Sequence, residues 1–115
     1  MAHSEEDQII VTRLTRVARR IARWRVVTSE REAQAVKDLR EIAGDRSDLL
    51  AEVAGLALGF GETQGDAIVL RHIAVLCAKA GADPEQVREW IEVGRHRSGF
   101  AGIPPATVGR PRYWH

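Results

Sequence analysis

The sequence predicts an all-α protein, a compact bundle of four to five helices followed by an extended C-terminal tail that contains proline and glycine. Apolar residues recur at spacings of three and four over most of the chain, which is the period of a helix with one buried face. Capping residues precede the helical runs and glycines close several of them. No stretch shows the alternation of a half-buried strand. We therefore assign residues 1–98 to one helical domain and residues 99–115 to the tail.

Composition fits a single soluble domain. The chain has 115 residues, 44% of them hydrophobic and 29% charged, which is enough to bury an ordinary core. Its net charge of +1 creates no overall attraction to nucleic acid or to a membrane. The single cysteine, Cys77, suits a reducing compartment, and the acidic segment Met1–Gln8 is not a secretory leader. We expect a cytoplasmic protein, and the preference for arginine over lysine is typical of a GC-rich bacterial gene.

The first helical run combines an apolar seam with a stripe of arginines. Ser4, followed by three acids, predicts its N-terminus. The seam consists of Ile10, Leu14, Val17, Ile21 and Trp24. The stripe consists of Arg13, Arg16, Arg19, Arg20 and Arg23. Such a stripe fits the phosphates of a nucleic acid, or it is a solvated face paired with acids of the next helix. Because the net charge is near zero, we favour the second interpretation.

A second helical run extends to Ala43 and ends at Gly44. Ser29 and Glu32 form a predicted capping box at its start. The apolar seam nevertheless continues in phase across the joint, so one long helix is an alternative to two. The β-branched residues at 26–28 favour two helices.

The central run, residues 48–60, is apolar or small on every side, which predicts a helix buried all round. One face carries large apolar residues: Leu49, Leu50, Val53, Leu56 and Phe60. On the other side Ala51, Gly55 and Gly59 stand four apart. This spacing allows close approach of a second backbone, from the same chain or from a second copy. We expect the segment Gly59–Gly65 to be the loop that ends the helix, and it lacks the lysine of a phosphate loop.

Two further helices are expected, over residues 66–80 and from 84 to about 97. The corner between them, residues 76–90, resembles the helix-turn-helix of bacterial regulators, with Cys77, Gly81 and Val87 at its characteristic places. The resemblance implies DNA binding, with Arg88 as a base-reading residue. Acids along the second helix would repel DNA, so we favour two core helices joined by a capped corner.

The sequence shows no group of residues whose spacing is typical of a catalytic or a metal-binding site. His72 and Cys77 fall on opposite faces of their helix, while Glu92 and His96 supply two ligands at most. We therefore expect no enzyme activity, no metal and no cofactor.

The tail carries arginine and aromatic residues but no acid, a composition typical of interface anchors. Its expected partner-binding residues are Phe100, Arg110, Arg112, Tyr113 and Trp114. The sequence thus favours a non-enzymatic, self-associating protein-interaction module whose tail docks on a protein partner. The alternative is a nucleic-acid-binding regulator that uses the first-helix arginines, the 76–90 corner, or both. We expect no association with membranes.

Overall fold

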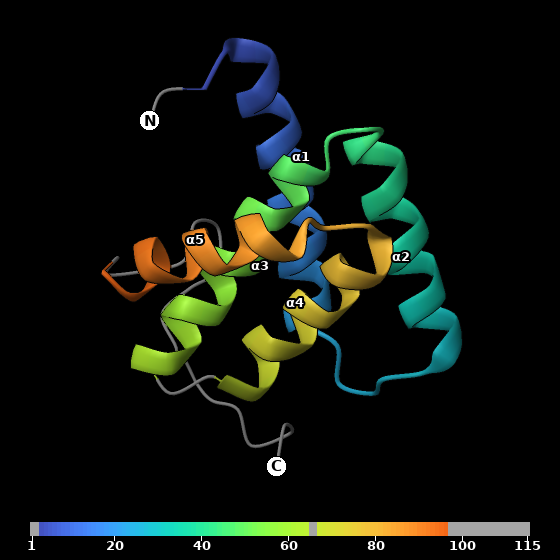
Figure 1. The fold of residues 1–115 in the computed structure, drawn as a ribbon. Helices are drawn as coiled ribbons and strands as arrows, with labels where there is room; N and C mark the ends of the chain where they lie inside the picture. The colour runs from blue at the N-terminus through green and yellow to red at the C-terminus, as the bar shows by residue number, and fades with distance from the viewer. Residues whose placement is uncertain (1–2, 65–66, 97–115) are drawn as a thin grey trace.

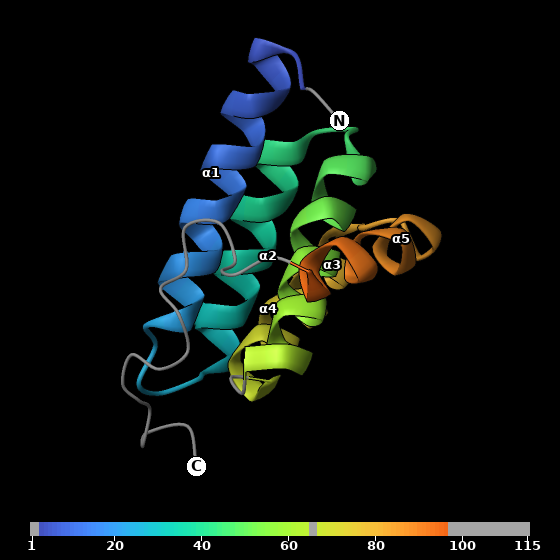
Figure 2. The same ribbon diagram turned by 90° about the vertical axis from the view of Figure 1, so that its left-hand side faces the viewer.

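The computed structural model describes residues 3–64 and 67–96, and every regular element within them is an α-helix. The five helices are α1 (Glu5–Ala22), α2 (Ser29–Ala43), α3 (Ser47–Gln64), α4 (Ala67–Ala80) and α5 (Pro84–Arg95). The predicted all-α class is confirmed (Figure 1). The helices form three layers: α1 beside α2, then α3 with α4, then α5 on the outer side of α3 (Figure 2). The predicted tail, residues 99–115, lies outside the described residues.

Residues 5–43 form two helices, so the favoured alternative is confirmed. Helix α1 ends at Ala22, and the chain reverses direction before α2. The N-cap of α2 is Thr28, whose hydroxyl accepts a hydrogen bond from the Arg31 amide at 3.1 Å. The capping box predicted at Ser29 is therefore wrong by one residue. A Thr side chain reaches the same orphan amides as a Ser side chain, and Ser29 becomes the first residue of the helix.

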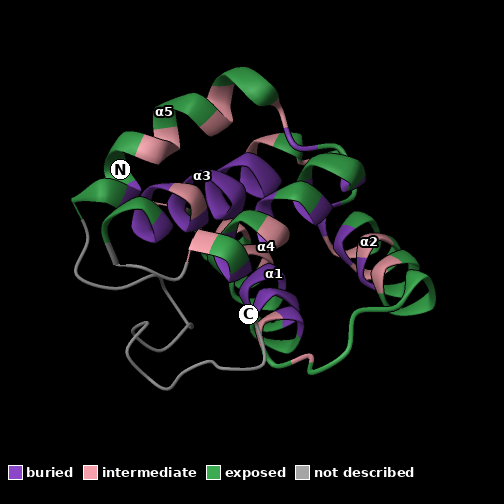
Figure 3. Cartoon of the chain, turned by 90° about the horizontal axis from the view of Figure 1, so that it is seen from below, coloured by how far each residue is buried: buried purple, intermediate pink, exposed green. Residues whose placement is uncertain are grey.

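Helix α3 lies at the centre of the core, as its sequence predicts. The large apolar residues of the predicted face are each at most 3% exposed, and the small residues opposite are buried too, whereas Leu58 is partly buried (Figure 3). Elsewhere the largest fully buried side chains are Leu14, Ile21, Leu39, Leu70, Ile73 and Leu76. Glu52 is the exception within α3, a carboxylate only 6% exposed.

Helix α3 continues to Gln64, so the loop expected at Gly59–Gly65 was placed too early. Gly59 and Gly61 are both helical, although each glycine costs a helix about 1 kcal/mol relative to alanine. Close packing explains why the helix continues. A Cβ on Gly61 would lie 3.2 Å from the Leu70 Cβ and 3.3 Å from the Ala67 Cα, both in α4.

The backbone that approaches the glycines of α3 within one chain is that of α5. A Cβ on Gly55 would lie 2.6 Å from the carbonyl oxygen of Val87, and one on Gly59 would lie 2.8 Å from the amide nitrogen of Arg95. Gly94 of α5 is in the same situation, since a Cβ added there would lie 2.6 Å from the carbonyl oxygen of Leu56 in α3. A real Cβ essentially never comes within 3.0 Å of such atoms. The missing side chains thus allow the two helices to cross in contact.

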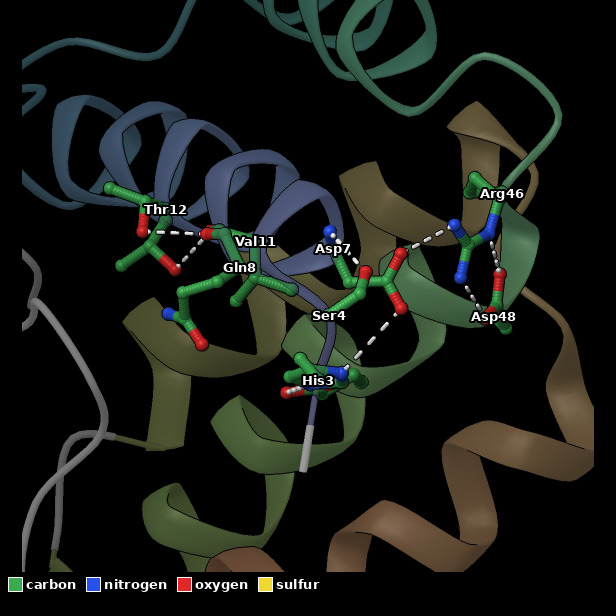
Figure 4. A network of polar contacts seen from close by, with 10 residues as sticks. His3, Ser4, Asp7, Gln8, Val11, Thr12, Arg46 and Asp48 are labelled. Atoms are coloured by element: carbon green, nitrogen blue, oxygen red, sulfur yellow. Dashed lines mark hydrogen bonds and ion pairs between the residues drawn. The ribbon is translucent and has the colours of Figure 1, made fainter. Parts of the chain in front are cut away.

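A polar network joins the N-terminus of α1 to the start of α3 (Figure 4). Arg46 donates to Asp7 at 2.7 Å and to Asp48 at 3.1 and 3.0 Å. Hydrogen bonds from this guanidinium hold the pKa of both carboxyl groups below the ordinary value of 3.8. Nearby, the Nε2 of His3 lies 2.8 Å from one oxygen of Glu52 and 3.0 Å from the other. The buried carboxylate is therefore paired.

Candidate functional site

A groove of about 820 Å³ lies where α1 ends and the chain turns into α2. Its described lining consists of one aromatic residue and six arginines: Trp24, Arg16, Arg19, Arg20, Arg23, Arg25 and Arg31. Neither an acid nor an aliphatic residue is among those lining residues. We call this feature the arginine groove.

Helical spacing and a chain reversal together build the arginine groove. Arg16 and Arg20 of α1 and Arg23 at its C-cap lie on the same side, because positions three and four apart on a helix are neighbours. The opposite face of α1 is buried in the core. After α1 ends, the turn supplies Trp24 and Arg25, and the first turn of the antiparallel α2 supplies Arg31. The Arg31 guanidinium donates to the Val26 carbonyl oxygen at 2.8 Å, which holds it across the turn.

Arg20 of the groove has a carboxylate partner on the neighbouring helix. Its guanidinium lies 2.5 Å from Asp38 of α2. Burial raises the pKa of Asp38, but hydrogen bonds from Arg20 and Gln34 outweigh it and hold that pKa below its ordinary value. Asp38 therefore stays ionised near neutral pH. Within the described part of the chain, Arg16 and Arg23 form no ion pair.

The other acids of α2, which are Glu30, Glu32 and Glu41, lie outside the groove lining. Glu32 lies 3.2 Å from His72 of α4. Glu30, in the same turn, is exposed and does not belong to the groove lining. The expected pairing between the arginine stripe and the acids of α2 is thus observed at Asp38 and not at Glu32.

The helix dipole accounts for part of this clustering. Arg19 and Arg20 lie in the last turn of α1, where the partial negative charge of the helix end favours cations. The remaining four lining arginines bring further positive charge to the same hollow. Asp38 compensates the charge of Arg20, but like charges that line one hollow still repel, and an anion held among them relieves that repulsion. The arginine groove is therefore suited to an anionic ligand.

Trp24 is fixed against the body of the protein. Its amide donates to the Ile21 carbonyl oxygen at 3.2 Å, just past the end of α1. Its ring meets the His72 ring edge-to-face, with centroids 6.2 Å apart. The sequence predicts Trp24 only as a core residue of the seam. Its place between Arg23 and Arg25, one residue past the helix cap, was the signal for a second role.

The structure does not bring every predicted nucleic-acid residue together. Arg13 lies on α1 but outside the groove lining, and Arg88 lies on α5, in the layer farthest from α1 (Figure 2). The 76–90 corner is well capped, since Asp83 accepts from the Glu85 amide at 3.0 Å.

The outer face of α5 is acidic. Its exposed charged residues include Glu85, Glu89 and Glu92, with the cation Arg88 among them. Arg95 is also exposed, but it is paired with Glu62 at 2.6 Å and with Glu92. This charge pattern gives the corner resembling a helix-turn-helix little attraction for phosphate.

The described side chains that could act as nucleophiles or metal ligands lie apart from one another. Cys77 is fully buried, and burial raises the pKa of its thiol to about 12, which leaves it unreactive. Glu92 and His96 lie 3.7 Å apart on the surface. Over residues 3–64 and 67–96, no three His, Cys, Asp or Glu side chains are grouped as metal ligands. In the same residues, no helix is long and apolar enough to cross a membrane. The predicted docking residues of the tail, 100–114, lie outside the described part.

Comparison of the chain with known protein families, with curated proteins and with solved structures finds no match. A proposal for the function therefore rests on the geometry of the arginine groove.

Proposed function

We propose that this protein binds nucleic acid and that the arginine groove holds the phosphate backbone of the ligand. The observation that carries the proposal is the set of six arginines around one groove with no acid in its described lining. Guanidinium groups are planar and always charged, and they donate paired hydrogen bonds to phosphate oxygens.

The lining favours nucleic acid over a protein partner. The core of a protein–protein interface is largely apolar and contains few charges. In the arginine groove, Trp24 is the one large apolar residue of the described lining, and all the others are cations. An acidic polypeptide is the remaining competitor, and polyglutamate serves as its probe in the experiments.

Charge asymmetry supports the same proposal. The six groove arginines exceed the net charge of +1 for the whole chain, so the rest of the chain is net acidic. Phosphate is therefore attracted at one end of the α1–α2 pair and repelled over much of the remaining surface. The protein-interaction module predicted from residues 99–115 remains a separate proposal that rests on those residues.

The test compares two double variants that each remove two positive charges. One removes arginines of the groove (Arg16→Gln with Arg23→Gln), and the other removes exposed arginines outside it (Arg71→Gln with Arg88→Gln). Binding of a fluorescent oligonucleotide is measured by anisotropy from 50 to 200 mM salt. Circular dichroism checks that both variants fold.

We expect the affinity of the groove variant to fall about tenfold or more, because a hydrogen bond to a charged group is worth roughly 1.5–3 kcal/mol. The slope of log K against log salt should also flatten by about 0.7–0.9 for each phosphate that the variant no longer neutralises. The outer variant should bind nearly as the wild type does. If the affinity falls equally in both variants, or if the wild type does not bind the oligonucleotide, the arginine groove is not a nucleic-acid-binding site.

A further inference from the structure

We infer that the ligand is a single strand and that one of its bases stacks on Trp24. This inference rests on the proposed function, which it makes more specific. Its starting observation is that the only aromatic residue in the described groove lining lies among the arginines that would bind phosphate.

Trp24 is positioned in advance for stacking. The end of α1 fixes its backbone, and His72 of α4 contacts its ring edge-to-face. Trp24 is partly buried and is one of the residues that line the groove. A side chain already held in place loses little conformational entropy when a ligand binds. Phosphate binding alone requires no aromatic surface here, whereas base stacking does.

The shape of the groove favours a single strand over a duplex. The groove is a shallow hollow of about 820 Å³ that lies open to solvent. Proteins that read duplex DNA usually insert a convex helix or ribbon into the major groove. The arginine groove is instead a shallow hollow, a shape suited to a flexible strand that lays its backbone and one base along it.

The chemistry of the lining indicates recognition without sequence preference. In a duplex, the faces of the bases are covered by their neighbours, so an indole reaches them only at an end. In a single strand, every base has a free face, and stacking on an aromatic side chain strengthens binding on the order of ten- to a hundredfold per base. The described lining offers arginines for phosphates and Trp24 for a base, which is the combination used by proteins that bind single strands.

The first experiment compares three DNA ligands of equal length, about 12 nucleotides, which is within the site size of such proteins. Polyglutamate is titrated in parallel as the acidic polypeptide. The DNA ligands are a single strand, the corresponding duplex and an abasic strand that keeps the phosphates but lacks the bases. The protein carries Trp90→Phe and Trp114→Phe, so that Trp24 is its only tryptophan. We expect the single strand to bind tightest and to quench Trp24 fluorescence, and the abasic strand to bind at least tenfold more weakly without quenching.

The second experiment separates stacking from packing, because Trp24 also contacts the core. Trp24→Leu keeps an apolar side chain but removes the aromatic face, and Trp24→Phe keeps a smaller aromatic face. We expect Trp24→Leu to lower the affinity for the single strand on the order of ten- to a hundredfold and to leave the affinity for the abasic strand unchanged. Trp24→Phe should retain most of the affinity for the single strand. If Trp24→Leu does not fold, the comparison of the single strand, the duplex and the abasic strand in the first experiment still tests whether a base stacks on Trp24.

The outcomes distinguish this inference from the proposed function. If the abasic strand or the duplex binds as tightly as the single strand, stacking is overturned and phosphate binding stands. If no nucleic acid binds but polyglutamate does, both proposals fail and the ligand of the groove is an acidic polypeptide. If none of these ligands binds, both proposals fail as well.

Discussion

The guanidinium of Arg46 lies 2.7 Å from the carboxylate of Asp7, across 39 residues of sequence (Figure 4). The same guanidinium donates two hydrogen bonds to Asp48. One side chain in the turn before α3 thereby ties the first turn of α1 to the start of the central helix.

These hydrogen bonds predict that the stability of the folded protein depends on pH in the acid range. The pKa values of Asp7 and Asp48 lie below 3.8 in the folded protein, so the unfolded chain binds more protons as the pH falls. Their contribution is complete above about pH 5 and is lost as the pH falls through the lowered values. Arg46→Met should therefore lower the urea midpoint at pH 7 and lower it less at pH 3. A difference from the wild type that is equal at both pH values would contradict the prediction.

The buried pair of His3 and Glu52 predicts an asymmetric response to mutation. His3→Ala leaves a carboxylate that is 6% exposed without its partner, at a cost of about 1–3 kcal/mol in the free energy of unfolding. In a Glu52→Gln background, the same change should cost less, because no buried charge remains. Urea denaturation of the four proteins measures this coupling. His96→Ala is the control, since His96 is 80% exposed beside Glu92 and an exposed pair contributes little.

Close contact between α3 and α5 predicts that Gly55 tolerates no side chain. Gly55→Ala should lower the melting temperature although alanine favours helix, and Gly55→Leu should cost about 1–3 kcal/mol or more. The mass measured by light scattering should not change with the substitution, because the partner helix is in the same chain. Ala78→Leu, at an exposed position of α4, is the control and should have little effect. A higher melting temperature for Gly55→Leu would disprove the contact.

Burial of Cys77 predicts a thiol that reacts only when the protein opens. Its pKa of about 12 and its exposure of 0% leave almost no accessible thiolate at pH 8. Labelling by Ellman's reagent should be slow in buffer and should accelerate with urea in parallel with the loss of helical circular dichroism. Rapid labelling of the folded protein would show that α4 is not packed as described.

Helix positions could be predicted from the sequence because their signals are local. The hydroxyl of Ser4, the carboxylate of Asp83 and the apolar spacing of Leu14, Val17 and Ile21 act within one or two turns. The same local signals predicted the wrong end for α3, since glycines at 59 and 61 are typical of helix ends. Contacts with α4 and α5 outweigh that preference, and those helices lie later in the sequence.

In the candidate site, the arginine stripe of α1 follows from the sequence alone, because residues three and four apart share a helix face. Only the folded chain shows that Arg31 and Trp24 lie in the same groove as this stripe, because their placement depends on how the chain reverses between α1 and α2. The same is true of the helix that covers Gly55 and of the pairing of His3 with Glu52. Periodicity identifies the face on which a side chain lies, whereas its partner is set by packing between segments far apart in the chain.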